Sequence, residues 1–393
     1  AFRSAQAPPA GPVFVSIPMD LLAEESHFPF PARTSLTWDR PAENTDEAAA
    51  LLRSARRPAI VAGDGVGRAD AAADVVQIAE CLGAAVYHQP MFDRVDFPLD
   101  HPQYLGMLPP ENEEIRRRLE GHDVVFLVGA RAFAPHHYSA ALAIPADVAV
   151  VQLDDDWAEL GRNYPARVAM VGSVGATLRR LATRLADVTP RAEPLETVIA
   201  AARSRRQRID AVLPADLQTP LDARVAAGSL AGALDPTAIV VEEAITTGLP
   251  LRDALLLSGS DSFHHTVGGG LGWGIGAAAG VAMGSPGRRV IAAVGDGCAL
   301  FGAHGLWSLA RHRLPVTVVV FANGEYRTLK QTLTKMKAPA GSQGRFVGLD
   351  LTSPSIDWLK LAEGFGVAAT GVSSSAELVA AIRDKGPDDG PLL

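Results

Sequence analysis

The sequence predicts an α/β protein whose sheets are parallel and whose chain forms more than one domain. Apolar runs rich in β-branched residues recur along it, and segments of helical composition separate them. Continuous runs of this kind are typical of strands buried on both faces of a parallel sheet. At 393 residues the chain is also too long for a single hydrophobic core. We therefore expect three-layer domains built from alternating strands and helices.

Residues 34–187 are predicted to form a Rossmann-like domain. Its expected elements are a helix at 45–55, a strand at 59–62, a helix ending near Leu82, and strands at 124–128 and 148–153. Glycines at 63, 65 and 67 are reminiscent of a dinucleotide-binding fingerprint, but their spacing differs from the full motif. We therefore interpret these glycines as a structural turn.

A charged helix and linker are expected over 188–221, followed by a second α/β domain over 222–393. The arginines of the helix indicate a solvated face better than a nucleic-acid patch. Strands in the second domain are expected at 238–241, 255–257, 290–294 and 316–321. The uncharged segment 266–286 is too rich in glycine for a membrane span. It predicts a phosphate-facing loop followed by a buried helix.

Composition excludes several functional classes. Charged residues make up 20% of the chain and the net charge is −8, which argues against a nucleic-acid or anionic-membrane surface. The two cysteines, Cys81 and Cys298, fit no disulfide framework and no zinc-ligand spacing. A reducing cytoplasm is the expected location.

Polar residues follow two of the predicted strands at the point where each strand ends. Gly295-Asp296-Gly297 follows the strand at 290–294, and Asn323 follows the run at 315–322. Parallel strands end at one edge of their sheet, where open α/β folds bind ligands. A carboxylate and an amide oxygen suit Mg²⁺ or Ca²⁺, and glycines let the backbone approach a phosphate. The sequence therefore predicts a metal and phosphate site at this edge.

This pattern resembles the signature of thiamine-diphosphate-dependent enzymes, in which Gly-Asp-Gly is followed by a pair of asparagines. Asn323 lies 27 positions after Asp296, and Ala322 replaces the first asparagine of the pair. The resemblance implies thiamine diphosphate as cofactor and Mg²⁺ (or Ca²⁺) as metal. The implied metal ligands are Asp296, Asn323 and the main-chain carbonyl of Glu325. Segments at 11–20, 119–125, 133–138 and 268–297 further resemble benzoylformate decarboxylase.

The same resemblance assigns further contacts to the cofactor. Leu271 corresponds to a bulky residue under the bent cofactor, and the carbonyl of Gly269 corresponds to an acceptor for its aminopyrimidine. An ordinary core leucine is the alternative for Leu271. For Thr246 and Thr247, which are implied to bind the diphosphate, a solvated loop is the alternative. The remaining residues implied to contact the cofactor are Thr246, Thr247, Gly295, Gly297, Cys298 and Tyr326. Cys298 replaces a common serine, and a thiol is a weaker donor.

Catalytic and substrate residues follow from the same comparison. His136 corresponds to an active-site histidine and is predicted to relay a proton, because imidazole titrates near neutral pH. A surface histidine is the alternative. The substrate pocket is implied to include His265, Thr328 and Thr332, which makes it more polar than the aromatic pocket of benzoylformate decarboxylase.

The resemblance implies decarboxylation of a benzoylformate-like 2-oxo acid to an aldehyde and CO₂. An acetolactate synthase-like carboligase and a non-catalytic cofactor-binding homologue are the alternatives. Residues 1–33 resemble the end of the family's pyrimidine-binding domain plus a linker, so the chain is expected to be a piece that lacks the domain carrying the activating glutamate, and to stop one strand short. A homodimer or tetramer with active sites at subunit interfaces is also implied.

Overall fold

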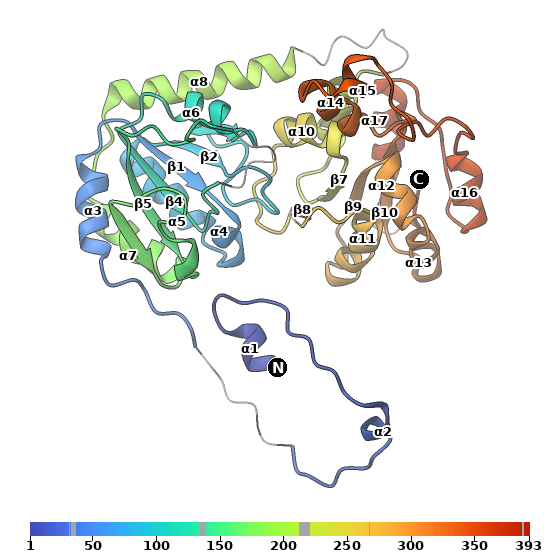
Figure 1. Ribbon diagram of the computed structural model, residues 1–393, viewed down its shortest axis with the longest axis horizontal. Helices are drawn as coiled ribbons and strands as arrows, with labels where there is room; N and C mark the ends of the chain where they lie inside the picture. Colours follow the sequence, from blue (N-terminus) through green and yellow to red (C-terminus); the bar gives the residue numbers. More distant parts are fainter. Residues whose placement is uncertain (31, 33–36, 134–138, 212–220, 267, 387–388) are drawn as a thin grey trace.

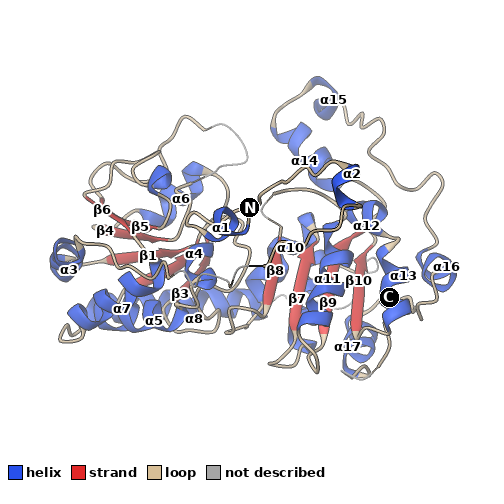
Figure 2. Ribbon diagram, turned by 90° about the horizontal axis from the view of Figure 1, so that it is seen from below, coloured by secondary structure: helices blue, strands red, loops and turns tan. Residues whose placement is uncertain are grey.

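Two parallel sheets, each covered by helices, make up the body of the protein (Figures 1 and 2). The computed structural model describes residues 1–393 except 31, 33–36, 134–138, 212–220, 267 and 387–388. Every pairing between neighbouring strands in both sheets is parallel. The predicted parallel α/β class is therefore confirmed.

The first sheet has six strands in the order β3-β2-β1-β4-β5-β6. In chain order these strands are β1 (Pro58–Ala62), β2 (Ala85–His88), β3 (Tyr104–Met107), β4 (Val124–Val128), β5 (Ala149–Asp154) and β6 (Val168–Val171). Its helices are α3 (Thr45–Ser54), α4 (Asp64–Arg68), α5 (Ala72–Leu82), α6 (Asn112–Leu119) and α7 (Val174–Leu185), with a 3₁₀ turn at Trp157–Glu159. The strand order reverses direction between β1 and β4.

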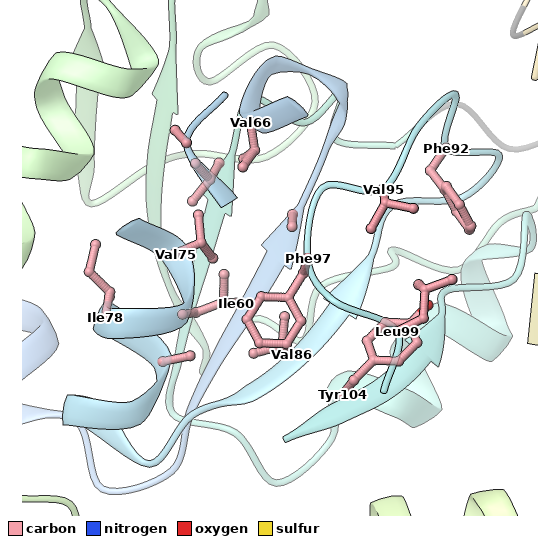
Figure 3. Close-up of a cluster of buried hydrophobic side chains, with 14 of the residues drawn as sticks. Ile60, Val66, Val75, Ile78, Val86, Phe92, Val95, Phe97, Leu99 and Tyr104 are labelled. Carbon is pink, nitrogen blue, oxygen red and sulfur yellow. The ribbon is translucent and has the colours of Figure 1, made fainter. Parts of the chain in front are cut away.

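The core of this sheet forms where strand side chains meet α5 and the loop after β2. Figure 3 shows Val75 of α5 near Ile60 of β1, with Phe97 beside Val86 of β2. Ile60, Val86 and Phe97 are fully buried. Burying an aliphatic or aromatic side chain of this size contributes about 1.5–3 kcal/mol, so this contact is a main source of stability.

The second sheet has four strands in the order β10-β9-β7-β8. They are β7 (Ile239–Glu243), β8 (Phe263–His265), β9 (Val290–Gly295) and β10 (Val316–Phe321). Its helices are α9 (Ala223–Ala233), α10 (Ile245–Ala254), α11 (Trp273–Gly284), α12 (Asp296–Gly302), α13 (Gly305–His312), α14 (Arg327–Lys335), α15 (Pro339–Ser342), α16 (Trp358–Gly364) and α17 (Ser375–Arg383).

Alternate residues of the second sheet face two different helix layers. Val240 and Ile291 share a core with Leu251 of α10, whereas Val241 and Val294 belong to the core of α11 and α13. The core on the α10 side is continuous with that of the first sheet, and the Phe92 and Phe263 rings lie 5.1 Å apart between centroids. The hydrophobic cores of the two sheets are therefore continuous at this contact.

Segments outside the sheets complete the chain. Helix α8 (Ala192–Asp210) packs against β3 and leads toward the second sheet. The N-terminal segment carries α1 (Phe2–Gln6) and α2 (Met19–Leu22) and extends below both sheets in Figure 1, with Pro8, Pro9 and Ala10 lining a cavity beside α4. Its apolar side chains are largely exposed, with Phe14 at 91%. None of the helices in the described part of the chain has the length and apolar character needed to cross a bilayer.

The structure corrects the prediction of a strand at 255–257. Those residues form a connection after α10, and the fourth strand is instead β8. Leu255 and Leu257 are buried, but Leu256 is 52% exposed. The Leu257 carbonyl accepts the N–H of Leu99, which lies in the loop between β2 and β3 of the first sheet, at 3.0 Å. The apolar run therefore fills the contact between the sheets, a role that periodicity does not distinguish from a strand.

Two further predictions were only partly right. Gly63 caps α4 and Gly65 lies within α4, so this run forms a short helix and not a turn. Helix α11 has a buried face, but Met283 on it is 53% exposed, so the helix is half-buried. Strands β2, β3, β6 and β8 were not predicted, because each has only three or four residues.

Candidate functional site

The ends of β9 and β10 place Asp296 and Asn323 at one sheet edge, as the sequence predicted. The two strands are neighbours in register, with Gly295 opposite Phe321. Asp296 is 3% exposed, and its carboxylate accepts the N–H of Gly297 (Oδ1, 2.8 Å) and of Gly324 (Oδ2, 2.7 Å). Asp296 therefore joins the end of one strand to the loop that follows the other.

The loop after β10 provides further oxygen atoms. Asn323 Oδ1 accepts the Glu325 N–H at 2.9 Å, which fixes the loop. The Glu325 side chain pairs with Lys330 (2.6 Å) and Arg327 (2.7 Å), and these hydrogen bonds lower the pKa of its carboxyl. Because the side chain is held by cations, the main-chain carbonyl is the group of Glu325 left to bind a metal.

This set of donors suits a hard divalent cation. A carboxylate oxygen has more than one acceptor position, so a single N–H bond to each oxygen of Asp296 leaves capacity for a metal. Carboxylate, amide and main-chain oxygens are the ligands that Mg²⁺ and Ca²⁺ prefer. In the described residues no group of three or more His, Cys, Asp or Glu side chains is placed to hold a metal. A metal here would therefore depend on the Asn323 and Glu325 oxygens as well as on Asp296.

A cavity of ≈ 300 Å³ opens beside these residues, and we call it the strand-end cavity. Its lining residues are Ala244, Ile245, Thr246, Thr247, Leu271, Gly295, Asp296, Gly297, Cys298, Phe301, Phe321, Asn323, Glu325, Tyr326, Arg327, Thr328 and Leu329. Eleven of the predicted site residues are thus brought together. Gly269, His265 and Thr332 do not line the strand-end cavity, and His136 lies outside the described residues.

The first turn of α10 is oriented to receive an anion. The helix begins at Ile245, directly after β7, and its N-terminus has no side-chain cap. The first N–H groups of a helix lack intrahelical partners and carry partial positive charge. Thr246 and Thr247 lie in this turn and line the cavity, and the Thr246 and Thr328 hydroxyls lie 3.0 Å apart. The turn therefore offers amide and hydroxyl donors to a phosphate group.

Cys298 lies in the first turn of α12 and lines the cavity. Burial raises the pKa of its thiol to about 12, and the nearby carboxylates of Glu243 and Glu242 add to this effect. The thiol is therefore neutral at physiological pH and does not repel an anion. Gly295 adds no side chain, and a Cβ there would lie 3.7 Å from the Cys298 sulfur.

Leu271 reaches the cavity from a glycine-rich loop that Glu243 holds in place. The Glu243 carboxylate, at the end of β7, accepts the N–H groups of Gly272 (2.6 Å) and Gly274 (2.6 Å). Gly272 has φ +89°, and a Cβ there would lie 2.7 Å from the Cβ of Phe301. Leu271, 39% exposed, is therefore presented to the cavity by a loop with little freedom. The sequence did not reveal this role, although two consecutive carboxylates at a strand end were a signal.

Glu242 explains why His265 lies away from the cavity. Its carboxylate is buried against Arg252, whose Nε lies at 2.8 Å, and against His265 Nδ1 at 3.3 Å. Burial opposes ionisation of Glu242, yet the charge of Arg252 and the contact with His265 outweigh it and lower the pKa of the carboxyl to about 2. His265 Nδ1 also lies 2.9 Å from the Glu242 carbonyl. The His265 ring is therefore held against Glu242 of β7.

Both cysteines are free in the structure. Cys81 lies on α5, far along the chain from Cys298 on α12.

Comparison with known domain families gives two matches. Residues 45–181 match the thiamine pyrophosphate enzyme central domain, and residues 255–393 match the thiamine pyrophosphate enzyme C-terminal TPP-binding domain. The second match contains most of the strand-end cavity, including Asp296 and Asn323.

Individual relatives carry the names of two enzyme classes. Benzoylformate decarboxylase of Pseudomonas aeruginosa is 31% identical over 399 residues, which cover 100% of this chain and 71% of that protein. Acetolactate synthase isozyme 1 large subunit of Escherichia coli is 26% identical over 399 residues, covering 100% and 68%. The solved structure of a thiamine diphosphate-dependent 4-hydroxybenzoylformate decarboxylase from Rhodococcus jostii has a TM-score of 0.79 and 30% identity, covering 99% and 71%.

Proposed function

The chain belongs to the thiamine pyrophosphate enzymes, and from this premise we propose that it takes part in the decarboxylation of an aryl or branched 2-oxo acid to an aldehyde and CO₂. Thiamine diphosphate is the cofactor of this family, and Mg²⁺ is proposed as its metal. The observation that carries the proposal is the convergence of Asp296, Asn323 and Leu271 on one cavity at the end of β9 and β10.

We propose that two parts of the protein hold the diphosphate end of the cofactor. Asp296, Asn323 and the Glu325 carbonyl would bind the metal that neutralises the diphosphate. The first turn of α10, with Thr246 and Thr247, would donate to the diphosphate oxygens. When bound, thiamine diphosphate supplies the nucleophilic carbon and the electron sink that 2-oxo acid decarboxylation requires.

Leu271 would set the conformation of the bound cofactor. Its side chain projects into the strand-end cavity, and the loop that carries it is fixed through Glu243. A bulky group held this way excludes an extended ligand and favours a bent one. The carbonyl of Gly269, two residues earlier, remains the proposed acceptor for the aminopyrimidine, although Gly269 itself does not line the cavity.

Proton transfer is assigned to His136 on sequence grounds alone. An imidazole near its ordinary pKa can deliver and remove a proton at neutral pH, which decarboxylation requires after CO₂ departs. Cys298 is unsuited to this role because burial holds its pKa at about 12.

An aryl or branched substrate suits the apolar part of the cavity. Phe301, Phe321 and Leu329 line it beside the more polar Thr328. Pockets for small organic ligands are commonly apolar and aromatic with a few polar groups. His265 and Thr332, which are not in this lining, would contact substrate only outside the strand-end cavity.

We further propose that the working unit is a homodimer or a homotetramer, with the cavity at a subunit interface. Apolar side chains around the cavity are exposed, among them Phe301 at 58%, Leu329 at 50% and Ile245 at 45%. A contiguous apolar surface of this kind marks an interaction site. Sedimentation of the active full-length protein tests this, and an active monomer would contradict it.

The assay that tests the reaction compares two substrates with the full-length protein, thiamine diphosphate and Mg²⁺. CO₂ release from benzoylformate at a rate well above acetolactate formation from pyruvate is the expected result. The reverse ranking would favour the carboligase, which the acetolactate synthase relative supports as the second candidate. Saturable cofactor binding with neither reaction would favour a non-catalytic homologue.

A further inference from the structure

A second cavity, of ≈ 420 Å³, lies toward the C-terminal end of α10, whereas the strand-end cavity lies at its start, and we call the second the arginine cavity. It is lined by Leu105, Gly106, Met107, Pro109, Pro110, Arg118, Arg205, Arg208, Ile209, Arg224, Gly228, Leu249, Pro250, Asp253 and Ala254. These residues come from β3 and the loop after it and from α6, α8, α9 and α10. Among the residues that the structure describes, the lining has four arginines and one carboxylate, Asp253.

Arg205 is held in a fixed position on one wall. Its side chain is 14% exposed and donates to Asp253 Oδ1 at 2.8 Å and to the Asp253 carbonyl at 3.1 Å. Its guanidinium carbon lies 5.3 Å from the centre of the Tyr104 ring. Gly106 has φ +103°, and a Cβ there would lie 2.6 Å from Arg205 Nε. The glycine therefore leaves the space that the guanidinium needs.

Two of the other three arginines leave the cavity with excess positive charge. Within the described part of the chain no carboxylate pairs with Arg118 or Arg208, and Arg208 donates instead to the Ser204 hydroxyl at 2.9 Å. Arg224 pairs with Asp222 at 3.3 Å. Guanidinium groups present several donors in a fixed fork that matches the oxygens of phosphate and carboxylate. Two of these groups without a carboxylate partner, beside two that are paired, favour an anion with more than one negative charge.

We propose that the arginine cavity binds a small metabolite that carries a phosphate group. Its volume is in the range of small-molecule sites. A phosphate group is favoured because its oxygens, arranged around one atom, can accept from several guanidinium forks at once. The inference does not rest on the proposed reaction, since it concerns a different cavity.

Helix α10 links this cavity to the cofactor cavity. Ile245, Thr246 and Thr247 at its start line the strand-end cavity, and Asp253 and Ala254 at its end line the arginine cavity. A ten-residue helix is only about 15 Å long. A phosphate that draws Arg205 away from Asp253 would change the packing of α10, and hence the affinity for thiamine diphosphate.

The test titrates inorganic phosphate into the full-length protein, free of thiamine diphosphate, by calorimetry at low ionic strength. We expect saturable binding that weakens by about tenfold or more in Arg118→Gln/Arg208→Gln, because each lost charged hydrogen bond carries a large share of the affinity. Arg203→Gln, an exposed arginine of α8 outside the cavity, is the matched control and should bind as the unchanged protein does. Equal loss in both variants, or unchanged binding in the double variant, would overturn the site.

Two further measurements define the ligand and the link. Succinate, titrated in the same way, should bind more weakly than phosphate, and tighter succinate binding would overturn the choice of phosphate. Phosphate should also alter the affinity for thiamine diphosphate in the unchanged protein and in Arg203→Gln but not in the double variant. The same alteration in the double variant would show direct competition at the cofactor cavity and overturn the link through α10.

Discussion

The tripeptide Gly-Asp-Gly occurs twice at the end of a buried parallel strand, after β1 at 63–65 and after β9 at 295–297. Both aspartates begin a short helix, and both are buried, Asp64 at 6% and Asp296 at 3% exposure. Their surroundings nevertheless differ, and the difference shows which part of the signature carries the function.

After β1 the glycines serve close backbone packing. A Cβ on Gly65 would lie 2.7 Å from the Cα of Gly129, and one on Gly63 would lie 2.5 Å from the Cα of Ala130, both at the end of β4. Asp64 accepts the Asp93 N–H at 2.9 Å. Acidic residues outnumber arginines around the ≈ 570 Å³ cavity there, whose charged lining residues are Asp39, Arg40, Asp64, Arg68, Arg131, Asp154, Asp155, Asp156 and Glu159. This edge is therefore poorly suited to a diphosphate.

After β9 the neighbouring strand supplies what the first edge lacks. β10 is followed by Asn323, whose amide oxygen joins Asp296 at the strand-end cavity, whereas β4 is followed by Gly129. A carboxylate that begins a helix is common to both edges. The oxygen from the next strand makes one of them a candidate metal site.

The largest expected effect separates the two aspartates. Asp296→Ala should weaken Mg²⁺-dependent binding of thiamine diphosphate by more than about 100-fold, because the diphosphate loses its neutralising ion. Asn323→Ala should weaken binding less, since water can replace a neutral ligand. The measurement is a calorimetric titration of cofactor at fixed Mg²⁺.

Asp64→Ala is the matched control for this titration. It removes the same side chain from the other Gly-Asp-Gly and should leave cofactor affinity unchanged. Equal losses in the two variants would mean that the effect comes from general destabilisation. Unchanged affinity in Asp296→Ala would disprove the metal assignment.

The next largest effect is expected from His136→Ala, which tests whether the domain of the first sheet contributes a catalytic residue. His136 follows β4 in the sequence, and His136→Ala should lower turnover by about 10²- to 10⁴-fold while cofactor binding is retained. The pH dependence of kcat should lose a limb near the imidazole pKa, roughly 6.5 before perturbation. A lower rate with the pH profile preserved would indicate a steric role, and full turnover would remove His136 from the mechanism.

Glycine substitutions sharpen the comparison of packing. Gly65→Ala should lower the free energy of unfolding by about 2–3 kcal/mol, because the new methyl group meets the rigid backbone of Gly129. Gly297→Ala should cost less, because its Cβ would meet the Tyr326 ring at 2.7 Å, and a side chain can move. Urea denaturation measures both.

Cofactor affinity should rank these two variants in the opposite order. The displaced Tyr326 ring lines the strand-end cavity, so Gly297→Ala should bind thiamine diphosphate less tightly than folded Gly65→Ala does. Equal affinities would show that Tyr326 does not shape the cofactor site.

The smallest effect concerns pH. Burial, with the nearby charge of Asp93, raises the pKa of Asp64 to about 7 from 3.8. Between these values the folded state binds more protons than the unfolded state, so this group lowers stability as pH rises from about 4 to 7. Asp64→Asn should therefore raise the free energy of unfolding by about 1–3 kcal/mol at pH 8 and little at pH 4.

Denaturant unfolding at the two pH values measures this, with exposed Asp100→Asn as the control. Burial also raises the pKa of Asp154 to about 7, so the variant removes only part of the pH dependence. An equal gain at pH 4 and pH 8 would show that the Asp64 carboxyl does not titrate in this range.

Much of the fold could be predicted because its central strands have a distinctive sequence. β1, β4, β9 and β10 are five- or six-residue runs of β-branched and small apolar residues, and each forms within one or two residues of its predicted bounds. Edge strands such as β3 and β8 have only four and three residues, too few to show a pattern that differs from that of a loop. The prediction of a strand at 255–257 was wrong for the converse reason, because burial between two sheets produces the same apolar pattern as a strand.

The sequence by itself determined the chemical groups of the site and the edge to which they belong. Asp296 and Asn323 follow long buried strands, and parallel strands must end at the same edge. Only the tertiary structure decided which groups face the cavity. Glu243 fixes the loop that carries Leu271, and Glu242 draws His265 toward β7, through contacts between residues more than 20 positions apart. Such long-range contacts depend on which strands pair and on how the loop at 268–272 packs against β7, which local spacing does not encode.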